Sequence, residues 1–391
     1  MESTSEPRPT FEWHGKGWAP QLVQRFLGHN RPWQDIEGFY YRLVAGDASI
    51  LNVDFLNNES LQVANGGRVT FSGPGERAPL DTRQLRSDAK SSKGASPERK
   101  RESQHTRKTY AVAISFFGPA FSGWAWAPGL AGTAQGAVQD AIAKVVGLES
   151  HTQVVVNAAG RTDKGVSAYG QVVSFYSWEE LSLDDIIASI NAVSPGNLRA
   201  LHVQVVPRSF HATFKAVRRR YIYLLPLRSR PTGGSTEAPH EPVICPHSGI
   251  DLSVADASDI SPDAVNRLLK ALEVPKTVDF HAFARDTPKG KSLECSIVSA
   301  QAYPVVIPGV AQPEGSRALC IDVTADRFVR KMMRVLVATC VRESIPQAAA
   351  CGEHGDQALL RLAEMRDHLM TAPPAPALGL CLIAVGYDAA A

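Results

Sequence analysis

The chain has 391 residues, of which 44% are hydrophobic and 20% charged, and its formal net charge is +2. This composition is ordinary for a soluble globular protein of two or three domains. No apolar run approaches the roughly 20 residues that span a membrane, so we expect no membrane contact. The six cysteines are scattered without a Cys-x-x-Cys pair. This is typical of an intracellular protein with reduced thiols; the nucleus or cytoplasm is favoured, and the mitochondrion is left open.

The first 71 residues are expected to form an N-terminal extension to the main fold. Two short apolar runs, 39–44 and 50–55, favour a small β-rich appendage there. Residues 72–107 are rich in Ser, Gly, Pro, Lys and Arg and carry almost no large apolar side chains. Such a stretch cannot bury a core, so the sequence predicts a flexible basic linker before the main fold.

Beyond the linker, apolar periods of about two and 3.6 residues alternate, which predicts strands and helices in turn. Thr133, Ser182 and Ser261 are candidate N-caps of three helices. The segment 227–259 is rich in Pro, Ser, Gly and Thr and is predicted to be an insertion. The order predicts an α+β fold, an antiparallel sheet with helices packed on one face. Expected strands are 110–114, 201–206, 221–225, 297–303, 319–323 and 380–387, and later helices are expected over 263–273, 328–342 and 357–370.

Residues 160–165 read Gly-Arg-Thr-Asp-Lys-Gly and are the most informative segment of the chain. A valine-rich run before them and an alternating run after them predict a glycine-framed loop between two strands. Asp163 lies on this loop, between Arg161 and Lys164. A carboxylate held by backbone N–H groups and cations can serve as a nucleophile or a base. On these six residues alone, an Asx-turn that only closes the loop is slightly favoured over an active site.

Charge is distributed unevenly despite the small net value. No Asp or Glu occurs over 186–236, where eight Lys or Arg residues fall, and none occurs over 327–342, which carries five. Two basic zones in a near-neutral chain favour a positive face or groove for a polyanion over solvated surface charge, because a mixed surface would intersperse acids.

Arg218, Arg219 and Arg220 directly precede a predicted strand that contains Tyr221 and Tyr223. The two tyrosines share one face of that strand because side chains alternate. Arginines beside exposed tyrosines suit RNA, since cations meet phosphates and an aromatic ring stacks on an unpaired base. A half-buried strand with core tyrosines is an equally good interpretation.

A third stretch, residues 325–334, is predicted to begin a helix. Arg330 and Arg334 lie four residues apart and would share one face of that helix. An arginine there could pair with the carboxylate of Asp163 and orient it. A solvated arginine is the alternative.

Taken together, these stretches resemble the TruA-type pseudouridine synthases over about residues 108–388. Lys164 and Ser167 in Gly-Arg-Thr-Asp-Lys-Gly-Val-Ser-Ala look most like the eukaryotic branch, which acts on the tRNA anticodon stem-loop. The ordered matches also include Phe121-Ser122-Gly123-Trp124, Thr133-Ala134-Gln135-Gly136, Asn191-Ala192, Val278-Asp279-Phe280-His281-Ala282-Phe283 and Pro376-Ala377-Leu378-Gly379-Leu380.

The resemblance implies two similar α+β halves, 108–208 and 209–391, whose sheets join around a basic cleft. It implies that Asp163 is the catalytic aspartate and that Arg161 helps to displace or hold the target nucleotide. Tyr221 would stack on the target base, and Arg334 would pair with Asp163. Further contacts to RNA are expected from Lys164, Arg218, Arg219, Arg220, Arg330 and Lys331.

The reaction expected from the resemblance converts uridine to pseudouridine without gaining or losing atoms. It therefore needs no cofactor, and we expect no metal; His240, Cys245 and His247 lack a fourth ligand at short spacing. The expected partner is RNA, most simply tRNA, with ribosomal RNA and a homodimer left open.

The sequence departs from the family pattern at three places. Ala338 stands where the family usually has a glycine, and Ala125-Trp126-Ala127 lacks a glutamine that often follows the Phe-x-Gly-Trp segment. Cys295 stands where the family usually has an arginine. This departure mildly favours an alternative class, a weak or inactive RNA-binding relative that serves ribonucleoprotein assembly, for example of the mitochondrial ribosome. A synthase that acts on ribosomal RNA is a further alternative.

Overall fold

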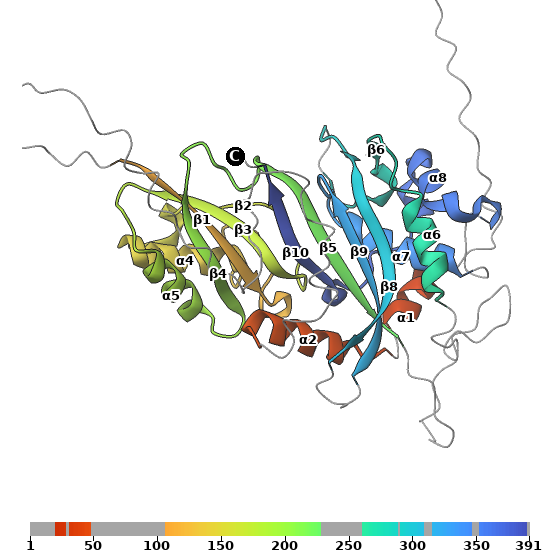
Figure 1. Ribbon diagram of the computed structural model, residues 1–391, viewed down its shortest axis with the longest axis horizontal. Coiled ribbons are helices and arrows are strands. Elements are labelled where there is room, and N and C mark those ends of the chain that lie inside the picture. Colours follow the sequence, from red (N-terminus) through yellow and green to blue (C-terminus); the bar gives the residue numbers. More distant parts are fainter. Residues whose placement is uncertain are drawn as a thin grey trace, which may run out of the picture.

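The structure is a computed structural model, and it describes residues 20–28, 31–47, 106–227, 260–287, 290–308, 315–345 and 352–388. One sheet runs through the described part of the chain in the order β4-β1-β3-β10-β5-β9-β8, with the short β2 paired to β3 (Figure 1). Its strands are β1 Lys108–Phe116, β2 Asn157–Ala158, β3 Ser167–Ser177, β4 Leu198–Val206, β5 Ala216–Pro226, β8 Ile297–Ile307, β9 Ser316–Ala325 and β10 Leu380–Tyr387. A separate pair joins β6 Val278–Asp279 to β7 Glu294–Cys295.

The C-terminal strand β10 lies in the middle of the sheet, between β3 and β5. It pairs antiparallel with β5, where Leu382 faces Tyr221, and parallel with β3, where Cys381 faces Ser167. The other neighbouring strands pair antiparallel. The sheet is therefore continuous across the middle of the molecule, and the expected α+β class is confirmed. The division into halves at residue 208 stays a prediction.

Helices cover one face of this sheet, and their starts follow the predicted caps. The hydroxyls of Thr133, Ser182 and Ser261 each accept a backbone N–H of the first turn. Gly147 ends the first of these helices in the left-handed conformation, at φ +75°. The face is covered by α4 Ala134–Val146, α5 Leu183–Val193, α6 Pro262–Lys270, α7 Met332–Ser344 and α8 Ala358–Met365, and their apolar sides meet the sheet in one core cluster.

The opposite face of the sheet is covered by α2 Trp33–Ala45. The preceding helix, α1 Pro20–Gly28, contacts α7 and buries Val23, Phe26 and Leu27 in the first cluster. Helix α2 contacts β3, β4, β5 and β8 and lies along the sheet in Figure 1 (red). It contributes to a second core cluster that includes Ile222 and Leu224 of β5 and Cys320 of β9. The α2 residues of that cluster are Ile36, Phe39, Tyr40, Leu43 and Val44.

The expectation of a β-rich appendage is therefore wrong for residues 39–44. The buried α2 positions recur at i, i+3, i+4, i+7 and i+8, the spacing of an apolar helix face. Gly46 then ends the helix at φ +84°. The second apolar run at 50–55, most of the linker 72–107, the insertion after residue 227, and His240, Cys245 and His247 all lie outside the described residues. Among the described helices, none has the length and apolar character needed to span a bilayer.

Candidate active site

The loop that carries Asp163 connects β2 to β3, as predicted. Its entry is fixed by Gln171 of β3, whose side-chain amide donates to the Gly160 carbonyl at 2.8 Å and whose amide oxygen accepts from the Gly160 N–H at 3.3 Å. Its exit is a turn in which the Val166 N–H donates to the Asp163 carbonyl at 3.2 Å, with Gly165 at φ +83°. The carboxylate is thus carried by a loop that is tied to the sheet at both ends.

Gly123 supports this loop from behind. It adopts φ +102°, and a Cβ at that position would lie 3.2 Å from the Lys164 nitrogen. The Trp124 N–H donates to the Thr162 carbonyl at 3.2 Å, and the Trp124 ring is 2% exposed against Phe116. The Phe-Ser-Gly-Trp segment therefore packs directly against the catalytic loop, and residue 123 must be glycine because a side chain there would crowd the backbone beside Asp163.

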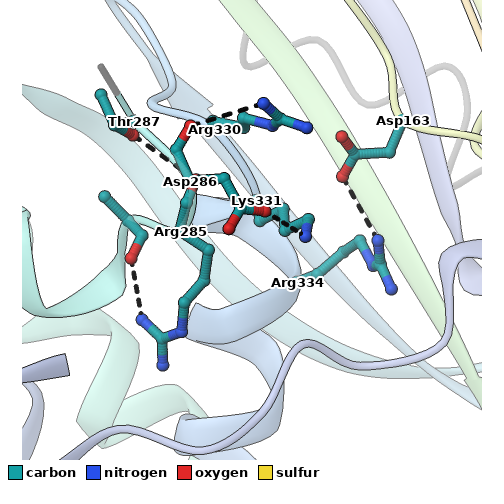
Figure 2. Close-up of polar contacts among 8 residues, drawn as sticks. Asp163, Arg285, Asp286, Thr287, Arg330, Lys331 and Arg334 are labelled. Carbon is teal, nitrogen blue, oxygen red and sulfur yellow. Dashed lines mark hydrogen bonds and ion pairs between the residues drawn. The ribbon is translucent and has the colours of Figure 1, made fainter. Parts of the chain in front are cut away.

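Asp163 and Arg334 meet across 171 residues of sequence. One Nη of Arg334 donates to a carboxylate oxygen of Asp163 at 3.2 Å, with the two side chains 16% and 26% exposed (Figure 2). Arg334 Nε donates to the Ala375 carbonyl at 2.7 Å, and the Ala375 N–H donates back to the Arg334 carbonyl at 3.0 Å. The Ala375 carbonyl therefore holds the guanidinium at Nε, and the Nη end points toward the Asp163 carboxylate.

Tyr221 lies next to the same loop. Its hydroxyl oxygen is 3.5 Å from where a Cβ at Gly160 would stand, and its ring meets Phe328 edge-on at 4.9 Å. The residue is 8% exposed, and burial raises the pKa of its hydroxyl well above the ordinary value. Tyr223 is fully buried and donates to the Pro376 carbonyl, so it is a core tyrosine.

Contacts within the protein argue against the expectation that Arg219 and Arg220 contact RNA. Arg220 is 2% exposed and pairs with Asp322 at 2.7 Å. Burial is the largest single influence and lowers the pKa of Arg220, but the hydrogen bonds and the charge of Asp322 act together with other nearby groups to raise that pKa overall. Arg219 donates five hydrogen bonds, which uses every N–H of a guanidinium. All five go to backbone carbonyls, at Ala159, Thr213, Ala216 and Asp326. Arg219 therefore has no N–H left for a phosphate, and Arg220 is buried away from one.

The buried pair gives a stability prediction. Replacing Asp322 with asparagine should lower the free energy of unfolding by about 3–5 kcal/mol, because Arg220 keeps a buried charge without its counter-ion. RNA affinity of the folded fraction should stay unchanged. The matched control is Asp356→Asn in the exposed Arg267–Asp356 pair, where the loss should stay below about 1 kcal/mol. Urea denaturation and an RNA binding titration measure both; weaker RNA binding by folded Asp322→Asn would contradict the assignment.

The other expected site residues lie at or near the surface. Arg161, Lys164 and Arg330 are exposed, and Arg218 and Lys331 are partly buried. Helix α7 begins at Met332, after Lys331 in the left-handed conformation, and not near residue 328 as expected. Arg330 therefore precedes the helix and does not share a helical face with Arg334.

Asp286 is a neighbour that the sequence did not single out. Its carboxylate accepts from the Lys331 ammonium at 2.6 Å, and this hydrogen bond lowers the pKa of Asp286 (Figure 2). Asp286 also has φ +53°, which aspartate tolerates better than most residues. The Arg285 N–H donates to the Arg330 carbonyl at 3.1 Å, which ties this turn to the start of α7. No spacing in the sequence connects residues 286 and 331, so no local signal could have revealed the pair.

Cys295, one departure from the family pattern, is fully buried in β7. Burial raises the pKa of its thiol to about 12, so it is a neutral packing residue. It pairs with Val278 of β6, and its Sγ lies 3.8 Å from the Leu293 carbonyl. A guanidinium at this position would have to be accommodated in the core.

Comparisons with known proteins give one consistent result. No family model matches the chain. A protein named tRNA pseudouridine synthase A from Chlorobaculum tepidum is 31% identical over 284 residues, which covers 72% of this chain and 99% of that protein. Proteins of the same name from Pelodictyon phaeoclathratiforme and Chloroflexus aurantiacus are 28% and 29% identical, covering 60% and 72% of this chain and 84% and 89% of their own.

Among solved structures, a CRISPR endoribonuclease bound to RNA is 12% identical, with a TM-score of 0.15 over 63% of this chain and 96% of its own. This similarity is too low to show a shared fold. The sequence relatives carry the conclusion, because the first of them is matched over almost its whole length. The chain belongs to the tRNA pseudouridine synthase A family.

Proposed function

We propose that this protein isomerises uridine to pseudouridine in tRNA, most specifically in the anticodon stem-loop, with Asp163 as the catalytic aspartate. The observation that carries the proposal is the Asp163–Arg334 contact at 3.2 Å beside Tyr221. It joins an acid, its orienting cation and an aromatic ring from three separate segments of a chain whose relatives bear that enzyme's name.

The reaction breaks the N1–C1′ bond of uridine and forms a C5–C1′ bond. The proton on C5 leaves and N1 gains one, so the atoms balance without a co-reactant. Asp163 serves as the nucleophile at the ribose or the base, or as a base at the ribose, and each route needs its carboxylate positioned. Arg334 holds one carboxylate oxygen and leaves the other to the substrate.

The target uridine must leave its stack, which costs a few kcal/mol that aromatic stacking and phosphate contacts offset. In this proposal Tyr221 contacts the extruded base. Its hydroxyl is protonated at neutral pH, as that of an ordinary tyrosine is, and burial raises its pKa further, so it can donate a hydrogen bond but carries no charge. Arg161, Lys164, Arg218, Arg330 and Lys331 are the side chains that we propose contact the RNA backbone.

Loss of the C5 proton supplies the test. Unmodified tRNA transcripts made with uridine tritiated at C5 should release tritium to water in the presence of the purified protein. Mapping pseudouridine on the product should then locate it in the anticodon stem-loop. Pseudouridine in another region of the tRNA would support the proposed reaction but contradict the anticodon stem-loop as its target. RNA binding without release would favour the alternative of a non-catalytic assembly protein.

A substitution series at Tyr221 tests its role. Tyr221→Phe should keep most RNA affinity and turnover, whereas Tyr221→Ala should lose about 1–3 kcal/mol of binding through stacking and should turn over more slowly still. Because the ring is also buried, the alanine variant should melt at a lower temperature. Turnover should therefore be measured well below that temperature. A destabilised variant with full activity per folded molecule would remove Tyr221 from the site.

A further inference from the structure

The side chain of Phe214 is 82% exposed, the highest value among the exposed large hydrophobic side chains of the described residues. Its ring packs on the imidazole of His211, with centroids 4.3 Å apart. One face of the aromatic pair is therefore supported by protein, and most of the Phe214 ring is open to solvent. An exposed aromatic side chain indicates a ligand-binding position when the side chain is held in place and its neighbours are charged.

The loop that carries Phe214 is fixed. The Thr213 hydroxyl donates to the Ala158 carbonyl at 2.6 Å, and the Lys215 N–H donates to the His211 carbonyl at 3.0 Å. His211 Nδ1 accepts from the Thr213 N–H at 3.2 Å, and Arg219 donates to the Thr213 carbonyl at 3.2 Å. The ring is thus presented by a braced turn, and its exposure does not reflect a loose chain.

The position of this turn relates it to the catalytic loop. Arg219, which holds Thr213, also donates to the carbonyl of Ala159, where the catalytic loop begins. The same guanidinium donates to the carbonyl of Asp326, next to the exposed Arg327 of the second basic zone. One partly buried cation therefore joins three segments: the catalytic loop, the Phe214 turn and the start of the second basic zone.

The Phe214 turn is attached next to the start of the catalytic loop. Ala158, which accepts from the Thr213 hydroxyl, directly precedes that loop, and Asp163 lies five residues further along the chain. The contacts described above hold the Phe214 turn, and none of them involves Asp163, Tyr221 or Arg334. Phe214 therefore lies beside the expected catalytic residues and not among them.

We propose that Phe214, supported by His211, stacks on an unpaired base of the substrate RNA that flanks the reacting uridine. The inference rests on the proposed function for the identity of the RNA. RNA is favoured over a protein partner because the turn belongs to the acid-free stretch 186–236, with exposed Arg208 on the same connection between β4 and β5 and Arg327 next to the Asp326 carbonyl that Arg219 binds. An aromatic face among cations is how proteins hold single-stranded nucleic acid.

The test is a set of Phe214 variants in the Asp163→Asn background, titrated with an unmodified tRNA transcript. Phe214→Ala should weaken binding about 5- to 150-fold, the value of one base stacked on an aromatic ring. Phe214→Trp should bind at least as tightly as the parent, and Phe214→Leu should bind like alanine. The matched control is Tyr41→Ala on α2, an exposed aromatic 44% accessible on the opposite side of the sheet, which should bind like the parent.

Salt dependence distinguishes stacking from a change in charge contacts. The slope of log affinity against log salt should be the same in Phe214→Ala and in the parent, because stacking releases no counterions. Binding within twofold of the parent by Phe214→Ala, or full binding by Phe214→Leu, would overturn the stacking role. A changed slope would also overturn it.

Tritium release by the wild-type protein, measured in parallel, separates this proposal from the proposed function. If release occurs and Phe214→Ala binds normally, the stacking proposal fails and the function stands. If no release occurs but Phe214→Ala binds weakly while Phe214→Trp binds well, the function fails and the stacking site stands.

Discussion

Replacing Asp163 with asparagine is expected to lower pseudouridine formation by roughly 10²–10⁴-fold or more, since the amide can act neither as a nucleophile nor as a base. Folding and RNA affinity should change little, because asparagine is nearly isosteric and its side-chain oxygen can still accept from Arg334. Single-turnover tritium release, melting temperature and RNA affinity measure the three quantities. Turnover within tenfold of the wild type would contradict the assignment of Asp163.

Substitutions at Arg334, the ion-pair partner of Asp163, complement this variant. Arg334→Ala removes the cation opposite Asp163 and the Nε hydrogen bond to the Ala375 carbonyl, while the hydrogen bond from the Ala375 N–H to the backbone carbonyl of residue 334 remains. We expect it to lose activity and to melt at a lower temperature, because the half-buried Asp163 carboxylate loses its partner. Arg334→Lys keeps the charge, but an ammonium cannot reach Ala375 and Asp163 with a rigid fork, so it should recover stability better than activity.

Much of the local structure followed from sequence patterns. The caps at Thr133, Ser182 and Ser261 were readable because a hydroxyl before an apolar helical period has one common use. The pairing of Asp163 with Arg334 was also expected, but its basis was a resemblance to known enzymes. Spacing alone could not relate two residues 171 positions apart.

The sequence could not predict the contacts of the Arg218–Arg220 run. Strand alternation places neighbouring arginines on opposite faces, yet it does not say what lies on either face. Arg220 meets Asp322, which β9 brings alongside it, and Arg219 meets four carbonyls from separate segments. Two arginines of a charge run that resembles an RNA-binding surface therefore form a core ion pair and a set of backbone contacts, and only these long-range contacts distinguish them from surface arginines.

Residues 39–44 were predicted as a strand but belong to helix α2, and the reason is different. Phe39-Tyr40-Tyr41 and Leu43-Val44 are aromatic and apolar enough to suit a strand, and Gly38 precedes them. The competing signal was the period: Ile36, Tyr40, Leu43 and Val44 fall on one helical face, and that face is buried on the sheet. Periodicity over the longer window was the better guide than local strand propensity.

That helix also reaches the segment that holds Arg334. Tyr40 is fully buried, and its hydroxyl donates to the Gly379 carbonyl at 3.0 Å. A Cβ at Gly379 would stand 2.6 Å from the Tyr223 ring, whose hydroxyl donates to the Pro376 carbonyl. Residues 375–379 are thus fixed by α2 and β5 together with Arg334, which makes Tyr40 a remote support of the Asp163–Arg334 pair.

Tyr40→Ala is accordingly expected to lower the free energy of unfolding by about 3–5 kcal/mol, the cost of a cavity at a large core side chain. Tyr40→Phe removes only the hydroxyl and should cost about 1 kcal/mol, because the Gly379 carbonyl loses one partner. Tyr41→Ala, at a neighbouring tyrosine that is 44% exposed, is the matched control and should cost clearly less than Tyr40→Ala. Urea denaturation of the full-length variants measures all three, and tritium release at a temperature where each is folded measures the effect on the site. If Tyr40→Ala were no less stable than Tyr41→Ala, α2 would not be packed on the sheet as the structure has it. If it were unstable but fully active, Tyr40 would stabilise the fold without positioning Arg334.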